Sequence, residues 1–303
     1  MEQHDETDPF EALKDWAAET ERRVQRESRR GTLGRVLRVL GVTVVVAGVL
    51  AMAVPLVHSM LEDASPEAAP TVAVSEEPAV AGPFHGTPAA AYPVGEAGIV
   101  MPEPAAVQGF TAAQVESALG TVRSALIAGR LDDDMLTAHK PDTFLKTLSP
   151  TERQRVAKWF EGADFTGVAT WIDRSVQLDP AEKPRVSGVV TVASATDDDG
   201  RRLIRITTNF IWVYAFIGQF NASPVAAVHD EIQWDFPDTT NLRDADRGMW
   251  IHSTTSYTAL IDCDAIAKGL LAPTPLGNGE GITGDDPNEL LRADHDMKID
   301  GNC

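Results

Sequence analysis

An acidic residue within an apolar strand pattern is the first candidate for chemistry in this sequence. Val228, Ile232 and Trp234 alternate on one face of an expected strand over residues 226–236, and Asp230 falls on the same face. A carboxyl group buried among such neighbours has a raised pKa and can act as a general base. The other interpretation, which we favour from sequence, is a strand that begins later and leaves Asp230 as a solvent-exposed edge residue.

A second group could bind a metal. If the strand over residues 249–261 forms a hairpin with residues 226–236, Ile251 joins Trp234 on the apolar face. His229, Glu231 and His252 then lie on the opposite face, and imidazole and carboxylate ligands suit zinc. A solvated sheet face explains the same residues. We therefore expect no metal and no other cofactor.

Other motifs in the chain carry little chemistry. Asp294-His295-Asp296 is explained by a polar tail next to Cys303. The glycine-rich run over residues 277–281 follows no strand, so it does not indicate a nucleotide site. Residues Asp197 to Gly200 are expected to form a hairpin turn. A calcium-binding loop is the alternative, but the downstream glutamate that such a loop needs is absent.

The elements that would position these residues follow from periodicity. Thr111 and Gln114 form a capping-box signal before a helical stripe, and further helices are expected to begin at Pro141 and at Ser149. After Gly162 the apolar period changes to two. Strands are expected near residues 167–178, 186–195, 202–217, 226–236 and 249–261.

The expected strand over residues 202–217 is long and aromatic. Ile206, Phe210 and Trp212 would share one face, and Arg205 and Asn209 the other. Helices followed by a mainly antiparallel sheet define an α+β domain, which we place at residues 109–303. The order of elements over residues 110–262 resembles the NTF2-like cone, in which a curved sheet wraps a helix. The resemblance implies a cone pocket around Asp230.

An apolar run indicates where this domain resides. Residues 39–61 carry no formal charge, and Arg29, Arg30, Arg35 and Arg38 precede them. About 23 residues suffice to cross a bilayer, and basic residues favour the cytoplasmic side. We predict a transmembrane signal anchor over residues 36–61, a cytoplasmic tail over residues 1–35 and an extracytoplasmic remainder. Cleavage near Ala53 is the alternative.

Beyond the span, residues 62–108 are rich in Ala, Pro, Val, Glu and Gly. Such a composition buries too little apolar surface to offset chain entropy, so we expect a disordered stalk. The two cysteines of the chain, Cys263 and Cys303, both follow the span. In an oxidising compartment they are expected to form a disulfide that pins the C-terminal tail.

Charge restricts the partners. The chain carries −19, and residues 1–38 hold nine acidic and eight basic side chains, so the exported part carries about −18. Such a surface repels phosphate backbones, which argues against nucleic-acid binding. Arg outnumbers Lys, and Ala and Gly are frequent, which is typical of GC-rich actinobacterial coding.

This plan of a short tail, one span and an outer domain is similar to VirB8-like secretion components and to Mce-associated actinobacterial proteins. These resemblances imply a membrane-anchored, non-enzymatic binding or scaffold module of the cell envelope. Its partners would be the membrane and other envelope or secretion-system proteins, or further copies of the chain. The alternative is a ligand-binding protein or acid–base enzyme that uses the cone pocket around Asp230.

Overall fold

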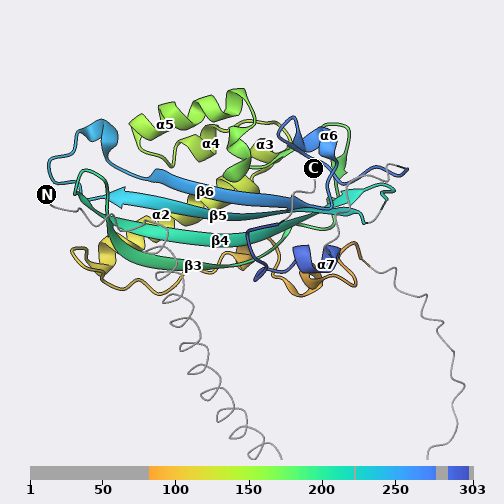
Figure 1. Cartoon of the computed structure of the whole chain (residues 1–303), viewed down its shortest axis with the longest axis horizontal. Helices are drawn as coiled ribbons and strands as arrows, with labels where there is room; N and C mark the ends of the chain where they lie inside the picture. Colours follow the sequence, from red (N-terminus) through yellow and green to blue (C-terminus); the bar gives the residue numbers. More distant parts are fainter. Residues whose placement is uncertain (1–81, 222, 278–285, 300–303) are drawn as a thin grey trace, which may run out of the picture. The chain divides into compact units, whose positions relative to one another are not determined.

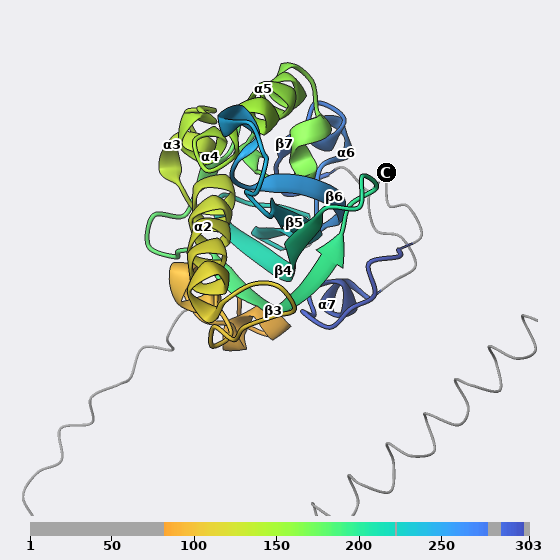
Figure 2. The ribbon, with the colours of Figure 1, turned by 90° about the vertical axis from the view of Figure 1, so that its left-hand side faces the viewer.

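The computed structural model describes residues 82–221, 223–277 and 286–299. These residues fall within one compact unit that extends from Pro78 to Cys303. An antiparallel sheet forms its centre, with the long helix α2 on one side and the short helix α7 on the other (Figures 1 and 2). The prediction of an α+β domain with a mainly antiparallel sheet is confirmed.

The main sheet contains long neighbouring strands in the order β3, β4, β5, β6, and each pair is antiparallel. Their bounds are Arg185–Thr196, Arg202–Ile217, Val225–Pro237 and Trp250–Ala259. All four agree with the expected strands to within two residues at each end. The expected strand over residues 167–178 is mostly wrong, because it holds only β1 (Trp171–Ile172) and β2 (Gln177–Leu178).

Alternation along β4 divides the sheet into two faces. Ile206, Phe210 and Trp212 are fully buried on the face that we call the inner face, as expected from the sequence. Arg205 and Asn209 point to the opposite, outer face, where their partners lie on β5. Period-two alternation of this kind fixes the register, since a slip by one residue would exchange the two faces.

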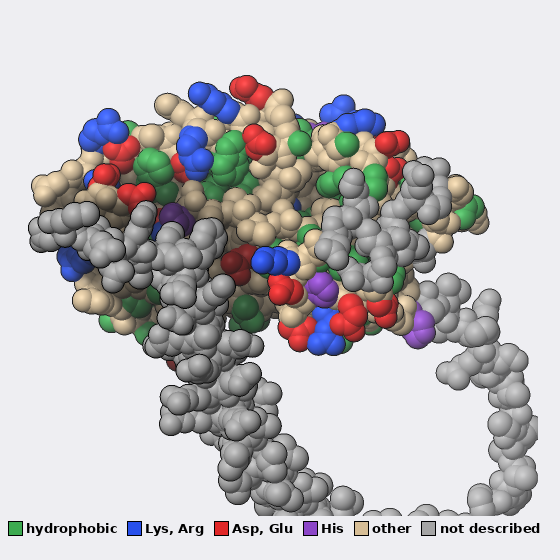
Figure 3. Space-filling model, viewed as in Figure 1, with side chains coloured by type: hydrophobic (Ala, Val, Ile, Leu, Met, Phe, Trp, Pro, Cys, Tyr) green, Lys and Arg blue, Asp and Glu red, His purple; other side chains and the backbone are tan. Residues whose placement is uncertain are grey.

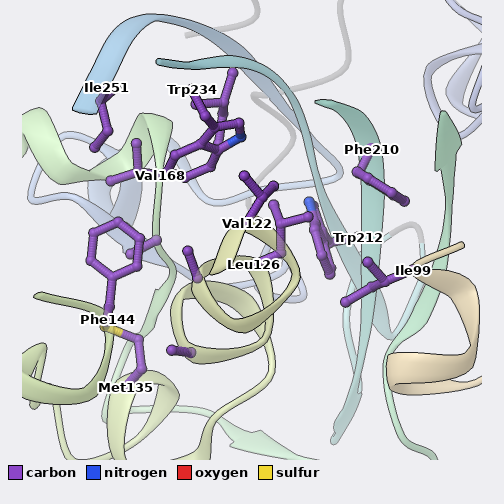
Figure 4. Packing of buried hydrophobic residues seen from close by; sticks show 14 of the residues in the cluster. Ile99, Val122, Leu126, Met135, Phe144, Val168, Phe210, Trp212, Trp234 and Ile251 are labelled. Carbon is purple, nitrogen blue, oxygen red and sulfur yellow. The ribbon is translucent and has the colours of Figure 1, made fainter. Parts of the chain in front are cut away.

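Helix α2 (Ala112–Arg130) covers the inner face. Thr111 caps it, because its side chain accepts the Gln114 N–H while the Gln114 side chain accepts the Thr111 N–H. The predicted stripe packs on the sheet, and Val122 and Leu126 lie beside Trp212 in Figure 4. Burial of this stripe, rather than helix propensity, is the main source of stability for such a helix.

Shorter elements complete the inner side, and their bounds are as follows: α3 (Asp133–Leu136), α4 (Asp142–Leu145), α5 (Pro150–Ala157), η4 (Lys158–Glu161), η5 (Asp164–Gly167), η6 (Asp244–Asp246), α6 (Cys263–Ile266) and β7 (Leu270–Leu271). Ser149 caps α5 by accepting the Glu152 N–H, and Pro150 is its first residue, as predicted. The predicted helix at Pro141 is α4. Strand β7 pairs with β1 in parallel.

Residues 82–108, which we assigned to the stalk, belong to the domain instead. They contain η2 (Pro88–Ala91) and η3 (Gly95–Gly98). Phe84 and Ala89 pack on the apolar end of the outer face, and Ile99 joins the inner core. The prediction of disorder is therefore wrong for this segment, because a few apolar anchors tie the Pro- and Ala-rich chain to the sheet. Residues 62–81 lie outside the described residues.

The C-terminal segment completes the cover over the outer face. Helix α7 (Pro287–Leu290) brings Leu290 and Leu291 against the apolar end of the sheet. The Tyr92 hydroxyl donates to the Leu291 carbonyl oxygen at 2.8 Å and accepts the Ala293 N–H at 2.9 Å. The beginning and the end of the described domain are thus joined to each other.

Several predictions concern parts of the chain without a description. The cytoplasmic tail, the span over residues 36–61 and Arg29, Arg30, Arg35 and Arg38 lie outside the described residues. Within the described residues, no helix is long and apolar enough to cross a membrane. Cys263 begins α6 and is disulfide-bonded. Cys303 is not among the described residues, so its pairing with Cys263 remains a prediction.

Candidate functional site

A hollow of about 700 Å³ opens beside the C-terminal end of α2, and we call it the α3–β2 hollow. It lies between α3, the segment from β1 to β2, the loop that leads into β3, and the end of β4. Much of its lining is apolar, and these residues are Leu131, Leu136, Ile172, Val176, Leu178, Pro180, Pro184 and Ala215. Hollows of this size and lining are typical of small-molecule and peptide-side-chain sites.

Local structure explains why the chain opens here. Asp132 caps α3 by accepting the Met135 N–H at 3.1 Å, which turns the chain away directly after α2. His139, at a φ of 56°, stacks on Trp171 with ring centroids 4.7 Å apart. Its Nε2 atom lies 2.9 Å from the Ile172 carbonyl oxygen. These contacts fix the segment after α3 against β1, and both elements contribute to the walls of the hollow.

Charged residues surround the apolar lining, and acidic ones dominate. The acidic residues are Glu96, Asp133, Asp173, Asp179 and Glu182, and the basic residues are Arg174 and Lys183. Hydrogen bonds from Ser175 hold the pKa of the Asp173 carboxyl below its usual value, so that group stays ionised. Glu96 and Glu182 are paired with arginines outside the lining. The other three carboxylates favour a ligand that carries positive charge.

Asp230, the candidate base, lies in the core. Its Oδ2 atom is 2.9 Å from Nη2 of Arg130 and accepts the Trp212 indole N–H at 2.8 Å. Asp230 is completely buried, so the favoured interpretation of a solvent-exposed edge residue is wrong. The reason is that β5 begins at Val225, which places Asp230 well inside the strand.

Arg130 binds several groups besides Asp230. Its Nη1 atom donates to the Ala169 carbonyl oxygen at 2.7 Å and to Thr170 Oγ1 at 2.8 Å, and Nη2 donates to the Thr166 carbonyl oxygen at 3.0 Å. The guanidinium thereby joins the end of α2, the segment after η5 and β5. We call the Arg130–Asp230 pair the core ion pair.

The electrostatics of the core ion pair are those of a structural contact. Burial raises the pKa of Asp230 to about 6, while Arg130 and the Trp212 N–H act against this rise. Among the described residues, Oδ1 of Asp230 and Nε of Arg130 have no hydrogen-bond partner. A carboxylate bound to a guanidinium beneath α2 cannot meet a substrate without opening the core. Asp230 does not line the α3–β2 hollow.

The candidate metal ligands do not converge. His229 is buried, with Nδ1 2.8 Å from the Tyr257 hydroxyl oxygen and Nε2 2.7 Å from Asn209 Oδ1. His252 occupies an irregularity in the pairing of β5 with β6 and lies 3.5 Å from Asp235 instead. Among the described residues, no three His, Cys, Asp or Glu side chains are grouped to hold a metal ion. The fold therefore does not bring His229, Glu231 and His252 together as a group.

The expected orientation of the hairpin is nevertheless correct. Ile251 pairs with Trp234 on the inner face, and His252 points outward. The Arg205 guanidinium forms two hydrogen bonds with Asp235, at 2.8 and 2.7 Å. Basic and acidic side chains are interspersed over the face shown in Figure 3. Beside His252, the Arg205 guanidinium neutralises the Asp235 carboxylate.

Two other sequence motifs have ordinary roles. Asp294 forms an ion pair with Arg292 at 2.8 Å, and the His295 ring contacts the Tyr257 ring at a centroid distance of 5.7 Å. The glycine-rich run begins at Gly277, and its remaining residues lie outside the described ones.

Sequence reasoning missed Arg130, although a signal was present. Leu119, Val122 and Leu126 define the apolar stripe of α2, and Arg130 is the next position on that stripe. A charged residue on a core-facing stripe requires a buried partner of opposite charge.

Comparison with known proteins adds no family to this description: no protein-family model, curated protein or solved structure matches the chain.

Proposed function

We propose that this chain is a membrane-anchored, extracytoplasmic binding module of the cell envelope, and that the α3–β2 hollow is its ligand site. The observation that carries the proposal is a hollow of about 700 Å³ with an apolar lining and a mainly acidic rim. On this proposal the α+β domain is an NTF2-like cone, and the hollow is the opening of that cone. The ligand combines an apolar part with a positive charge.

Binding without catalysis is supported by the position of the ionisable groups. Asp230 is held by Arg130 and Trp212 inside the core, away from the hollow. At the rim, Asp173 accepts the Ser175 N–H and Asp179 accepts the Ala181 N–H, so these carboxylates shape turns. The alternative, an acid–base enzyme built around Asp230, would require α2 to move away from the sheet.

The proposed location rests on the sequence before the domain. Residues 39–61 are uncharged and follow a run of arginines, which favours a retained signal anchor with the N-terminus inside. A disulfide at Cys263 supports an oxidising environment. The similarity in plan to VirB8-like and Mce-associated proteins supports envelope or secretion-system proteins as partners.

Site-specific photocrosslinking tests the ligand site. A benzophenone amino acid replaces Gln177, which lines the hollow, in the full chain in intact cells. A matched chain carries it at Thr255, an exposed residue on β6. We expect an adduct from Gln177 and not from Thr255. Val176→Trp, which fills the hollow, should abolish the adduct, and an adduct that survives this change would contradict the proposed site.

Topology is tested separately. Protease added to intact protoplasts should digest residues 82–303 and leave an N-terminal epitope tag protected on a short fragment. A domain that becomes sensitive only after membrane lysis would place it inside and exclude the proposed location. The two experiments fail independently, since a misplaced domain could still bind a ligand in its hollow.

A further inference from the structure

At one edge of the main sheet, helix α5 and the residue before it cover the start of β6. At the start of β6, the Ser149 N–H donates to the Met249 carbonyl oxygen at 3.0 Å. The Ile251 N–H donates to Glu152 Oε1 at 2.9 Å, and Arg155 Nη2 donates to the Ile251 carbonyl oxygen at 3.2 Å. Helix α5 thus satisfies backbone groups that a neighbouring strand would otherwise bind.

The opposite edge is covered only at its start. The Val186 N–H donates to the Pro93 carbonyl oxygen at 3.0 Å, and the Gly95 N–H donates to the Pro184 carbonyl oxygen at 2.8 Å. Backbone groups of successive strand residues alternate in direction. The outward groups that follow are those of Gly188, Val190, Val192 and Ser194. Among the described residues, no backbone group outside β4 is hydrogen-bonded to them.

We call residues 188–196 the β3 edge, and its composition is that of a strand suited to pairing. It contains no charged residue and no proline. Its register with β4 is unbroken, so no bulge bends it away. Val190 and Val192 pack partly on the inner core, while Val189 is 63% exposed on the outer face. Proteins that leave an edge unpaired usually place Lys, Pro or a bulge on it.

Charges of opposite sign flank the β3 edge. Asp198 and Asp199 are exposed in the turn after its last residue, and Lys183 is exposed before its first residue. None of these three side chains has an ion-pair partner among the described residues. Because antiparallel strands run in opposite directions, a two-fold axis at Val192 would place Asp199 of each copy opposite Arg185 of the other, two residues along the chain from Lys183.

We propose that the β3 edge pairs antiparallel with the β3 edge of a second copy, about a two-fold axis near Val192. The pairing joins the sheets of both copies into one. A two-fold axis perpendicular to the sheet keeps the two inner faces on the same side, so the alternation of apolar and polar side chains continues across the contact. This contact goes beyond ligand binding in the α3–β2 hollow.

The overall charge favours this surface over others for self-association. Each chain carries −19, so most surfaces of two copies repel each other. The uncharged β3 edge allows close approach, and the two Lys183–acidic-turn contacts add local attraction. A charge contact that forms twice by symmetry also selects the antiparallel orientation over any other.

The molar mass of the full chain in detergent micelles tests the proposal, by light scattering over a range of concentrations. We expect a dimer for the natural chain. Thr191→Lys combined with Ala193→Lys adds charge at exposed positions of the edge, and we expect the dimer to dissociate. Ser253→Lys with Thr255→Lys is the matched control, because it adds the same two charges at exposed positions on the outer face of β6, and it should stay dimeric.

A charge exchange identifies the second copy as the partner. Lys183→Glu alone, or Asp198→Lys with Asp199→Lys, should weaken dimerisation on the order of tenfold, since each change sets like charges together. The chain with all three changes should recover the dimer. Lys183 also lies on the rim of the hollow, so the readout is molar mass and not ligand binding.

Three outcomes would overturn the proposal. The first is a natural chain that stays monomeric at all concentrations, as would occur if another partner or the N-terminal segment occupied the edge. The second is a dimer that Thr191→Lys with Ala193→Lys leaves intact. The third is a triple charge exchange that weakens the dimer further. Circular dichroism of each variant verifies that the sheet is retained.

Discussion

His229 and Asp230 are neighbours on β5 and point to opposite faces of the sheet, yet both are completely buried. The polar groups of these two buried side chains have different kinds of partner. Asp230 remains an ion, and its partner Arg130 comes from a helix 100 residues earlier in the chain. His229 is surrounded by uncharged partners from adjacent strands, Asn209 and Tyr257. Pairing of the buried polar group on the inner face therefore depends on a charge far away in the sequence. On the outer face it depends on the register of adjacent strands.

The difference also appears in the protonation of the two groups. Burial raises the pKa of Asp230 to about 6, because the charged form of an acid is the ion. Burial lowers the pKa of His229 to about 4, with a smaller contribution from His295, because the charged form of a base is the protonated one. One cause thus acts in opposite directions on two adjacent residues.

Removing the charge of Arg130 should have the largest effect on the free energy of unfolding. Arg130→Ala leaves the Asp230 carboxylate buried without a counter-charge, and we expect a loss of about 3–5 kcal/mol in the free energy of unfolding. Urea unfolding of the full chain, followed by tryptophan fluorescence, measures it. The control is Arg123→Ala on the same helix, whose exposed pair with Glu96 contributes about 0–1 kcal/mol. Equal losses for the two variants would contradict a core ion pair.

Removing both charges should cost less than removing one. Arg130→Met with Asp230→Asn eliminates the unpaired ion and leaves an acceptor for the Trp212 N–H. We expect this double variant to recover about 2 kcal/mol or more of the loss caused by Arg130→Ala. The same urea titration measures it. A double variant as unstable as Arg130→Ala would show that the loss comes from packing and not from charge.

The two residues should also give stability opposite dependences on pH between about pH 4 and 6. Asp230 binds its proton more tightly in the folded state, so its contribution to stability falls as the pH rises in this window. His229 binds its proton more tightly in the unfolded state, so its contribution is lost as the pH falls from 6.5 towards 4.

Single variants separate these contributions. Relative to the natural chain, His229→Gln should gain stability on acidification, by at most about 1.4 kcal/mol per pH unit, and Asp230→Asn should lose it. Unfolding free energies at pH 6.5 and pH 4.5 give the difference, since carboxylates common to all chains cancel. Shifts of the same sign in both variants would refute the comparison.

The smallest effect on the free energy of unfolding is expected from removing the Tyr257 hydroxyl on the outer face. The Tyr257 hydroxyl lies 2.8 Å from His229 Nδ1 and donates to the Leu290 carbonyl oxygen at 3.0 Å. Tyr257→Phe should cost about 1 kcal/mol and increase hydrogen exchange of the backbone amides in residues 286–299. Tyr214→Phe, on the inner face, is the control and should leave exchange in that segment unchanged. Faster exchange in both variants would mean that the loosening is global.

Patterns within short windows predicted the fold well. The alternation in β4 and β5 is strong enough to fix strand ends and faces, and the Thr111–Gln114 capping box gives the start of α2. These signals act between residues that are close in sequence. Residues 82–108 escaped prediction because their burial depends on a few anchors such as Phe84 and Ile99, which bind to strands far along the chain.

The candidate site was less predictable, for the same physical reason. Nothing near Asp230 in the sequence reveals its pairing with Arg130. The irregularity opposite Gln233 moves His252 beside Asp235, and a shift by one residue leaves no trace in composition. The α3–β2 hollow arises from three segments that meet only after folding, so no single motif marks it.

The contact between Tyr92 and Leu291 spans 199 residues and sets the order in which the domain can be completed. During synthesis, Tyr92 emerges long before the segment that it binds. The outer apolar end of the sheet therefore stays uncovered until residues 286–299 have been made. Contacts of such long range form slowly, and their absence exposes apolar surface to aggregation. A chain that stalls before residue 286 would present this surface to chaperones and proteases, which would distinguish such copies from complete domains.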